Sequence, residues 1–405
     1  MRILKKVLWL AATWAALATT APAQAEPPRF ELIYTEPAET ELHQPLRAPA
    51  PLWAEAFEGA SKTIDIEQFY LAEQKGEVLD RVLDGLEKAA RRGVQVRVLV
   101  EDKMRKQSQP TLDRLAQWPN TQVRVLSWGQ LDPGPGRKAG GIIHAKFWIV
   151  DGKLGYLGSQ NFDWRSLSHI HELGVLIRDI HIAGQLEAIF EHDWSAQAKL
   201  AAKQVVAPLP ATEAERNTIG YLVGSPKPWL PAGVGDSESE LVRLIDTAKQ
   251  QVRVQVMKYS PLRHDGHTFY PEIDNALRRA AARGVKVELL VADWNTDKPA
   301  VAWLQSLDLV PNVTVKLVTI PQASRGPIPF ARVIHSKYAL FDDTTLWVGT
   351  SNWEGGYLDE SRNVELVIGE AALVGQSRSL YQQLWQSPYA QGLDACREYP
   401  TVKRN

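Results

Sequence analysis

Two histidine–lysine pairs stand 191 residues apart and carry residue types suited to phosphoryl transfer. His144 and Lys146 form the first pair, and His335 and Lys337 form the second (335 − 144 = 191). In an extended strand, residues i and i+2 point to one face, so each histidine would project with its lysine into a cleft. An imidazole can attack phosphorus or transfer a proton, and lysines can hold phosphate oxygens. The two pairs therefore predict one two-histidine site built between two similar halves.

The repeat continues around each pair at the same spacing. An aspartate, a glycine, a hydroxyl residue and an asparagine follow each pair: Asp151, Gly158, Ser159 and Asn161 in the first copy, and Asp342, Gly349, Thr350 and Asn352 in the second. We expect the asparagines and the hydroxyls to bind phosphate oxygens, because positioned cations and amides stabilise charge developing at phosphorus. An aspartate before a turn more often caps backbone amides than performs chemistry. We therefore assign the aspartates, with the two glycines, to a structural role.

Each histidine also needs a partner that fixes its tautomer. Glu172 follows His144 by 28 residues (172 − 144), and Glu365 follows His335 by 30 residues (365 − 335). Both glutamates begin an apolar run, so each could lie on a strand beside the histidine strand. A carboxylate in that place would orient the ring and raise its basicity. An ordinary charge at a strand end is the alternative for both glutamates.

The elements that would position these residues are duplicated as well. Residues 86–100 match residues 277–291 at the same offset, and each segment reads as a helix closed by a glycine, Gly93 or Gly284, followed by a buried strand. Helices are predicted over 77–92 and 238–251, and further strands over 63–71, 147–150, 155–158 and 173–177 and over 252–259, 338–341, 346–349 and 364–368. This order predicts an α/β fold of two similar halves, each a mixed β-sheet flanked by helices. A pseudo-twofold axis would place one active site at their interface.

The first residues are typical of an export signal. Arg2, Lys5 and Lys6 precede an apolar run over 7–17, and a small-x-small cleavage site ends at Ala25. The run is short for a membrane span of about 20 residues, and an uncleaved anchor is the alternative. We expect residues 1–25 to be a signal peptide and the mature chain to be periplasmic or secreted. The two halves are then assigned to residues 29–207 and 214–395.

Composition limits the possible functions. The 405 residues include one cysteine, so no intramolecular disulfide is available and stability must come from packing. Without the three basic residues of the signal, 43 basic residues face 47 acidic ones, which does not suit a non-specific nucleic-acid binder. A polyanion would have to be held by a local basic cleft. Two loops rich in Gly and Pro, 129–141 and 320–330, lead into the motifs and are expected at the mouth of the site.

The duplicated pattern His-x-Lys-x4-Asp-x6-Gly-Ser-x-Asn resembles the signature of the phospholipase D superfamily. Residues 144–166 and 349–353 look like the branch of phospholipase D3 and D4 and the poxvirus envelope phospholipases. Members of that branch include 5′ exonucleases for single-stranded DNA and RNA and enzymes that act on phospholipids. The resemblance implies catalysis without metal or other cofactor, with His144 as nucleophile and His335 as general acid and base. The animal members differ in their membrane anchor and multiple cysteines, so their localisation and substrate are not implied here.

These observations predict an exported, metal-independent phosphodiesterase that acts through a phosphohistidine, most specifically a 5′-exonuclease-like enzyme for single-stranded DNA or RNA. The alternative is a phospholipase D or phosphatidyltransferase that acts on phospholipid head groups. A non-catalytic binding protein is disfavoured because every motif position is intact in both halves. We expect no stable membrane span after signal cleavage, and the number of subunits is left open. Trp164 and Trp353, just after the motif asparagines, are assigned to core packing in preference to stacking on a base.

Overall fold

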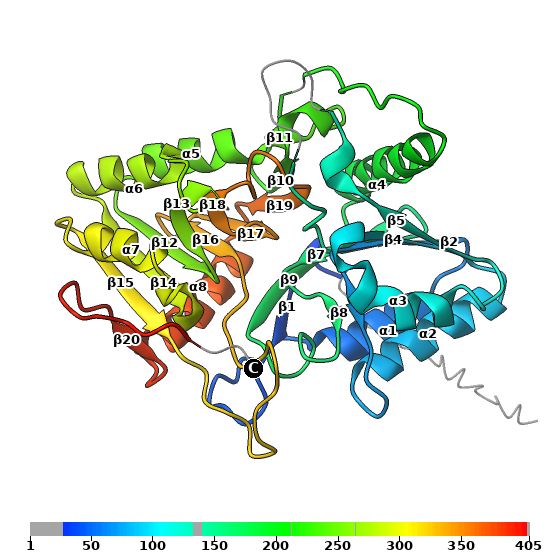
Figure 1. The fold of residues 1–405 in the computed structure, drawn as a ribbon, viewed down its shortest axis with the longest axis horizontal. Coiled ribbons are helices and arrows are strands. Elements are labelled where there is room, and N and C mark those ends of the chain that lie inside the picture. Colours follow the sequence, from blue (N-terminus) through cyan, green and yellow to red (C-terminus); the bar gives the residue numbers. More distant parts are fainter. Residues whose placement is uncertain (1–26, 133–139, 212, 264, 403–405) are drawn as a thin grey trace, which may run out of the picture.

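The computed structural model describes residues 27–132, 140–211, 213–263 and 265–402, so the predicted export signal lies outside the described residues. Figure 1 shows two sheets side by side, one from the first half of the chain (blue to green) and one from the second (green to red). Helices cover the faces of both sheets. This is the predicted α/β architecture of two similar halves with mixed sheets.

The first sheet contains seven strands. They are β1 (Phe30–Thr35), β2 (Thr63–Gln68), β4 (Gln95–Glu101), β5 (Thr121–Leu126), β6 (Phe147–Val150), β7 (Leu154–Gly158) and β9 (Glu172–Ile177). Their order is β1-β9-β7-β6-β2-β4-β5, with β2, β4 and β5 parallel to one another and the other neighbours antiparallel. The helices are α1 (Pro49–Glu58), α2 (Leu79–Arg91), α3 (Arg105–Leu115) and α4 (Ile180–Ala201), and β3 (Leu71–Ala72) pairs separately with β8 (Phe162–Asp163).

The second sheet repeats this arrangement and adds a strand at each edge. Its strands are β10 (Gly220–Ser225), β11 (Gly235–Asp236), β12 (Gln251–Val256), β14 (Lys286–Ala292), β15 (Val313–Val318), β16 (Tyr338–Phe341), β17 (Thr345–Gly349), β19 (Asn363–Ile368) and β20 (Ala390–Gly392). The order β11-β10-β19-β17-β16-β12-β14-β15-β20 places the repeated strands in the same sequence as in the first sheet. The helices are α5 (Ser237–Thr247), α6 (Glu272–Ala282), α7 (Ala300–Asp308) and α8 (Ala371–Gln386), and β13 (Tyr259–Arg263) pairs with β18 (Trp353–Gly355).

The repeated helix–glycine–strand unit forms as the sequence predicts. Gly93 follows α2 with φ of 100°, and its N–H donates to Ala90 O while Val94 N–H donates to Ala89 O. This pair of bonds closes the helix and requires a left-handed residue at the glycine. Gly284 has φ of 87° at the matching end of α6. The chain then enters β4, which lies parallel to β2, or β14, which lies parallel to β12.

The motif aspartates hold the turns between the strands that carry the motif. Asp151 and Asp342 both have positive φ, 55° and 52°. The Asp151 carboxylate accepts from the three backbone N–H groups of residues 61–63, and that of Asp342 accepts from those of residues 249–251. These bonds hold the pKa of both carboxyl groups below its usual range despite partial burial. Each aspartate thereby ties the β6–β7 or β16–β17 turn to the start of the neighbouring strand.

The two halves pack through reciprocal contacts. Helix α4 of the first half contacts β10 of the second, and α8 of the second contacts β1 of the first. Strands β7 and β9 face β17 and β19 across the interface. One apolar cluster includes Trp53 of the first half and Leu380 of the second, so the halves share a core. Trp164 and Trp353 are buried, as predicted. In the described part of the chain, no helix is both long enough and apolar enough to cross a membrane.

Candidate active site

His144 and His335 line one cavity of about 300 Å³ between the two halves. The His144 side chain is buried, and that of His335 keeps 12% of its surface exposed. The remaining lining is mostly apolar and rich in rings, with Phe69, Tyr70, Trp294, Phe330 and Tyr357 around the cavity. Phe69 and Tyr357 pack against the His144 ring, with centroids 5.3 Å and 4.7 Å away.

Each motif histidine is fixed by the backbone of the opposite half. His144 N–H donates to Arg362 O at 2.9 Å, and His335 N–H donates to His171 O at 2.8 Å. Arg362 and His171 are equivalent in the repeat (362 − 171 = 191) and stand just before β19 and β9. The approximate twofold symmetry is thus maintained by backbone hydrogen bonds at the site itself.

The partners of the two rings are exchanged between the halves. Glu172 Oε2 lies 2.8 Å from Nδ1 of His335, and Asn363 Oδ1 lies 3.1 Å from Nδ1 of His144. The sequence led us to expect Glu172 on the strand beside His144 and Glu365 on the strand beside His335. That pairing is wrong, because the start of each of these strands reaches across the interface. Asn363, and not Glu365, is the repeat equivalent of Glu172 (363 − 172 = 191).

Glu365 is buried away from the motif histidine. It lies two residues beyond Asn363 on the same face of β19, which is roughly 6–7 Å further along the strand. Its carboxylate accepts from Ser351 Oγ at 2.6 Å. Burial raises the pKa of Glu365 to about 7. Its predicted role beside His335 is therefore taken by Glu172.

The hydrogen-bond pattern fixes the tautomer of His144. Asn363 donates from Nδ2 to Tyr357 O at 2.8 Å, so its Oδ1 faces His144 and also accepts from Thr350 Oγ1 at 2.8 Å. His144 must then donate from Nδ1, which leaves the Nε2 lone pair unprotonated. For His335, the Glu172 carboxylate accepts from Nδ1 and is itself held by Ser166 Oγ at 2.5 Å.

Lys146 and Lys337 are fully buried beside the histidines. Each Nζ donates to the carbonyl oxygen of its own motif histidine. Burial, together with the neighbouring Lys337, holds the pKa of Lys146 well below its usual range, and burial lowers that of Lys337 to about 7. Burial and the two lysines also lower the pKa of His144 and of His335 well below 6.5. Both rings are therefore neutral at pH 7 in the free protein.

Of the polar residues assigned to phosphate binding, Asn161 lines the cavity. Its side chain is buried, and Oδ1 has no hydrogen-bond partner among the described residues. This amide oxygen can only accept a hydrogen bond, so a donor on a ligand would have to complete it, and phosphate oxygens would be bound by Nδ2. Asn352 Oδ1 instead accepts from Lys258 N–H at 3.3 Å, and its side chain also hydrogen-bonds Tyr357.

The two motif hydroxyls do not line the cavity as expected. Ser159 Oγ donates to Leu173 O at 3.2 Å and accepts from Leu173 N–H at 3.0 Å. Thr350 Oγ1 donates to Asn363 and accepts from Val364 N–H. Both hydroxyls are fully buried and already occupied, so they position β9 and β19 with the ring partners that these strands carry. Their assignment to direct phosphate contact is corrected accordingly.

The motif glycines allow the strands to approach one another. A Cβ on Gly158 would lie 2.5 Å from Gly174 Cα, and one on Gly349 would lie 2.5 Å from Val364 O. Neither position can accept a side chain without moving the backbone of β9 or β19. Within the described residues, no group of three or more His, Cys, Asp or Glu side chains could hold a metal ion.

Several residues of the site, namely the ring partner Asn363 and the cavity residues Phe69 and Tyr70, were not found from the sequence. Asn363 could have been found by applying the offset of 191 to Glu172. Phe69 and Tyr70 could not, because their repeat equivalents are Ser260 and Pro261. The strand predicted over 63–71 ends at Gln68, and the next two residues leave the sheet to line the cavity.

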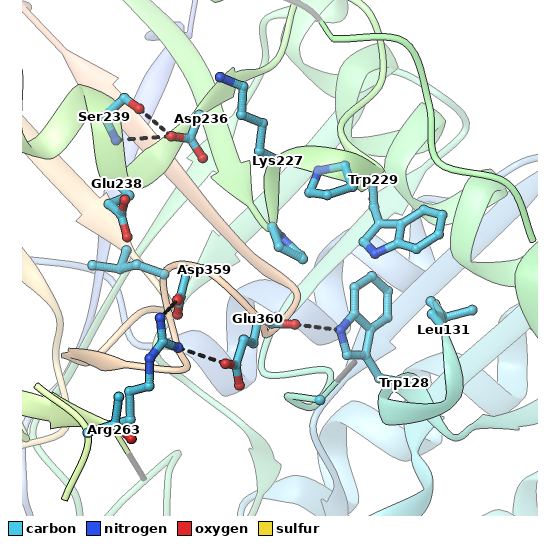
Figure 2. A pocket seen from close by; sticks show the side chains of 15 residues that line it. Trp128, Leu131, Lys227, Trp229, Asp236, Glu238, Ser239, Arg263, Asp359 and Glu360 are labelled. Atoms are coloured by element: carbon cyan, nitrogen blue, oxygen red, sulfur yellow. Dashed lines mark hydrogen bonds and ion pairs between the residues drawn. The ribbon is translucent and has the colours of Figure 1, made fainter. Parts of the chain in front are cut away.

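A second and larger cavity, of about 570 Å³, is lined in part by residues 358–360 (Figure 2). Trp128 Nε1 donates to Glu360 O at 2.8 Å, and Arg263 pairs with Asp359 and Glu360. Neither motif histidine lines this cavity. Of the described residues of the two glycine-rich loops, Leu131 and Gly140 of the first border this cavity, and Phe330 of the second lines the histidine cavity. The bonds from Trp128 and Arg263 to Asp359 and Glu360 stabilise the segment that leads into Asn363.

Sequence comparison identifies the family. Residues 54–194 and 241–385 match the family described as "Cardiolipin synthase, PLD-like domain". The chain is 33% identical over 382 residues to "5'-3' exonuclease PLD3" of Bos taurus, covering 85% of this chain and 76% of that protein. It is 32% identical over 366 residues to "Phospholipase D Z" of Dictyostelium discoideum, covering 84% and 85%. The chain belongs to the phospholipase D superfamily, and its class is that of a phosphodiesterase.

Solved structures share the fold. Phosphatidylserine synthase of Haemophilus influenzae superposes with a TM-score of 0.58 at 12% identity, covering 85% of each chain. Polyphosphate kinase of Porphyromonas gingivalis superposes with a TM-score of 0.55 at 16% identity, covering 90% of this chain and 48% of that chain.

Proposed function

We propose that this protein is a metal-independent nuclease for single-stranded DNA or RNA that acts through a phosphohistidine on His144. The observation that carries the proposal is the unequal pair of ring partners, Asn363 for His144 and Glu172 for His335, around one cavity. A neutral amide favours the neutral, nucleophilic imidazole, whereas a carboxylate stabilises the imidazolium that a general acid requires.

In the first step, His144 Nε2 attacks the phosphorus of a bound diester. The P–N bond forms as the bond to the leaving oxygen breaks, and that oxygen takes a proton from His335 Nε2. Because His335 is neutral in the free protein, the anionic substrate must raise its pKa on binding for it to carry this proton. Lys146, Lys337 and Asn161 stabilise the charge on the phosphoryl oxygens.

In the second step, neutral His335 accepts a proton from water as the water oxygen attacks phosphorus. The P–N bond breaks, and a phosphate monoester is released with His144 restored. Glu172 supports both steps because its carboxylate stabilises His335 whenever the ring is charged.

Two observations support nucleic acid as the substrate. The cavity is bordered by five aromatic rings, and aromatic side chains can stack on unpaired bases without sequence preference. A cavity of about 300 Å³ admits roughly one ordered nucleotide but not a duplex. The relatives named as 5'-3' exonucleases support cleavage from a chain end.

A phospholipid diester is the second candidate. Met104, Ile170, Met257 and Val333 contribute apolar surface to the cavity, which would suit a glycerolipid as well as a base. The relative named phospholipase D and the fold shared with phosphatidylserine synthase agree with this candidate. The same phosphohistidine would then be passed to water or to an alcohol.

Product analysis in EDTA separates the two candidates. Purified protein is offered 5′-labelled single-stranded DNA and RNA in one set of reactions and a phosphatidylglycerol or phosphatidylcholine dispersion in another. We expect stepwise release of mononucleotides without added metal. Release of head group with intact oligonucleotide would transfer the assignment to lipid chemistry. We further propose that the enzyme works outside the cytoplasm, which N-terminal sequencing of the native protein would test by its start near Glu26.

A further inference from the structure

Arg165 breaks the symmetry of the duplicated site. Its repeat equivalent is Gly356 (356 − 165 = 191), so only the first half places a guanidinium there. Arg165 lines the histidine cavity with 11% of its side chain exposed. Nε and Nη2 bond the Asp163 carboxylate, with Nη2 at 2.7 Å from Oδ2, and Nη1 donates to Pro329 O at 2.9 Å. These contacts hold the planar group rigidly and use three of its five N–H groups.

Phe330 follows Pro329, whose carbonyl oxygen accepts the hydrogen bond from Arg165. It lines the same cavity, keeps 59% of its surface exposed and has φ of 58°. A positive φ is costly for a bulky residue and persists only when the surrounding contacts enforce it. Before Phe330, the bond from Arg165 to Pro329 O holds this backbone conformation. After Phe330, the buried Arg332 holds it by donating to Pro321 O at 2.5 Å and to Ala38 O at 2.6 Å. An apolar ring is therefore held at the cavity mouth and left uncovered by the protein.

Both features are linked to the segment that carries His335, because Arg165 donates to Pro329 O and Phe330 is the next residue. Phe330 stands five residues before His335 on the same segment, whereas the neighbours of the His144 ring are Phe69 and Tyr357. In an in-line displacement, the leaving oxygen departs opposite His144 and receives its proton from His335. The part of the substrate beyond that oxygen must then extend past Arg165 and Phe330.

We propose that Arg165 and Phe330 form a subsite for the leaving-side nucleotide: the guanidinium binds the phosphate that follows the scissile one, and the phenyl ring stacks on the base between them. This inference rests on the proposed nuclease function and sharpens it. A polynucleotide carries a second phosphate at that place, whereas phosphatidylcholine carries one phosphodiester and nothing for Arg165 to bind. A guanidinium suits this task because it stays charged at every working pH, and N–H groups that are not used by Asp163 and Pro329 can still donate to phosphate oxygens.

The test uses three thymidine substrates that each contain one cleavable diester: the dinucleoside monophosphate TpT, and the same compound with an additional phosphate at its 3′ end (TpTp) or its 5′ end (pTpT). We expect kcat/KM in EDTA to be about tenfold or more higher for one of the two phosphorylated compounds than for TpT, the range of a charge-assisted bond. Arg165→Gln should bring this ratio close to one, while Arg165→Lys, which keeps a cation, should retain part of it. The other phosphorylated isomer serves as an internal control.

Two further variants complete the experiment. Phe330→Leu should lower the rate on the preferred compound several-fold but not on its analogue lacking the leaving-side base. Arg279→Gln, which removes a surface ion pair between Arg279 of α6 and Asp246 of α5, should leave every ratio unchanged. If Arg165→Gln lowers the rate on all three substrates equally, Arg165 only holds the loop and the subsite is refuted, although the nuclease function stands. If the wild-type protein cleaves none of the three but releases lipid head groups, the nuclease proposal fails and the subsite fails with it.

Discussion

Glu172 of the first half lies 2.8 Å from His335 of the second, so the carboxylate of one repeat orients the histidine of the other. The equivalent place beside His144 holds Asn363. Neither half can therefore form a complete site alone. The difference between a carboxylate and an amide gives two histidines with nearly identical motifs different chemistry.

Replacing Glu172 with Gln tests the acid–base role of His335. Gln can still accept from Nδ1, so the ring keeps its orientation, but it cannot stabilise the imidazolium. We expect kcat to fall about 100-fold or more, within the usual contribution of general acid–base catalysis. Steady-state kinetics on a dinucleotide measures the effect, and an unchanged circular dichroism spectrum establishes that the fold is intact. A loss of less than threefold would remove Glu172 from catalysis.

Replacement of each histidine identifies the nucleophile. His335→Ala should accumulate a phosphoenzyme on His144 when the substrate is a nitrophenyl ester, because this leaving group departs without a proton. His144→Ala should form no phosphoenzyme and show no turnover while keeping a normal circular dichroism spectrum. Acid-labile phosphate on the intact protein, read by mass spectrometry, distinguishes the variants. Phosphate trapped on His335 in the His144 variant would reverse the assignment.

The pH profile should report the environment of His144. Its pKa lies well below 6.5, with burial as the largest cause, so the ring remains unprotonated until pH falls through that lowered value. The contribution of His144 to the acid limb of kcat/KM, which reflects the free enzyme, is therefore expected below pH 6.5. Glu172, whose pKa burial raises to about 7, should contribute a separate decline near that pH. Asn363→Asp places a negative charge beside the ring and should move this limb to higher pH. An acid limb that does not move in Asn363→Asp would show that another group controls it.

Lys337 should contribute to the alkaline limb, together with His335, which must be protonated to act as the acid and whose pKa burial lowers in the free protein. Burial lowers its pKa to about 7, so the cation that attracts the phosphate is lost as pH rises through this value. We expect kcat/KM to decline above about pH 7. A phosphodiester keeps its single charge across this range, so the decline must belong to the enzyme. Activity that stays level to pH 9 would contradict the assignment of Lys337.

The repeat made most of the fold readable from the sequence. Strands β6 and β16 were predicted at their observed bounds, Phe147–Val150 and Tyr338–Phe341, because each apolar run is bounded by the motif and its turn. Helix α5 ends at Thr247, four residues earlier than predicted, since Gln251 already pairs in β12. Local residue patterns do not show at which residue a helix ends and the next strand begins.

The sequence was less informative about which residue hydrogen-bonds each motif histidine. Glu172 and Glu365 both begin apolar runs, and in the sequence nothing but the repeat offset distinguishes them. Their roles diverge because Glu172, like Asn363, is the first residue of its strand and reaches the interface, whereas Glu365 lies within its strand. Arg165 and Phe330 depend on a loop conformation stabilised by backbone carbonyls, which no residue pattern encodes.

Glu365 offers a last test, because burial without a charged partner should make it a source of pH-dependent instability. Its pKa rises from 4.5 to about 7 on folding, so the folded protein favours the protonated carboxyl. Stability from this group is complete below about pH 4.5 and declines as pH rises through 7, by roughly 3 kcal/mol in all. Glu365→Gln keeps the acceptor for Ser351 and carries no charge. We expect this variant to match the wild-type midpoint of thermal unfolding at pH 5 and exceed it at pH 8, with activity retained within a few-fold. Equal midpoints at pH 8, or a loss of activity like that of Glu172→Gln, would return Glu365 to the active site.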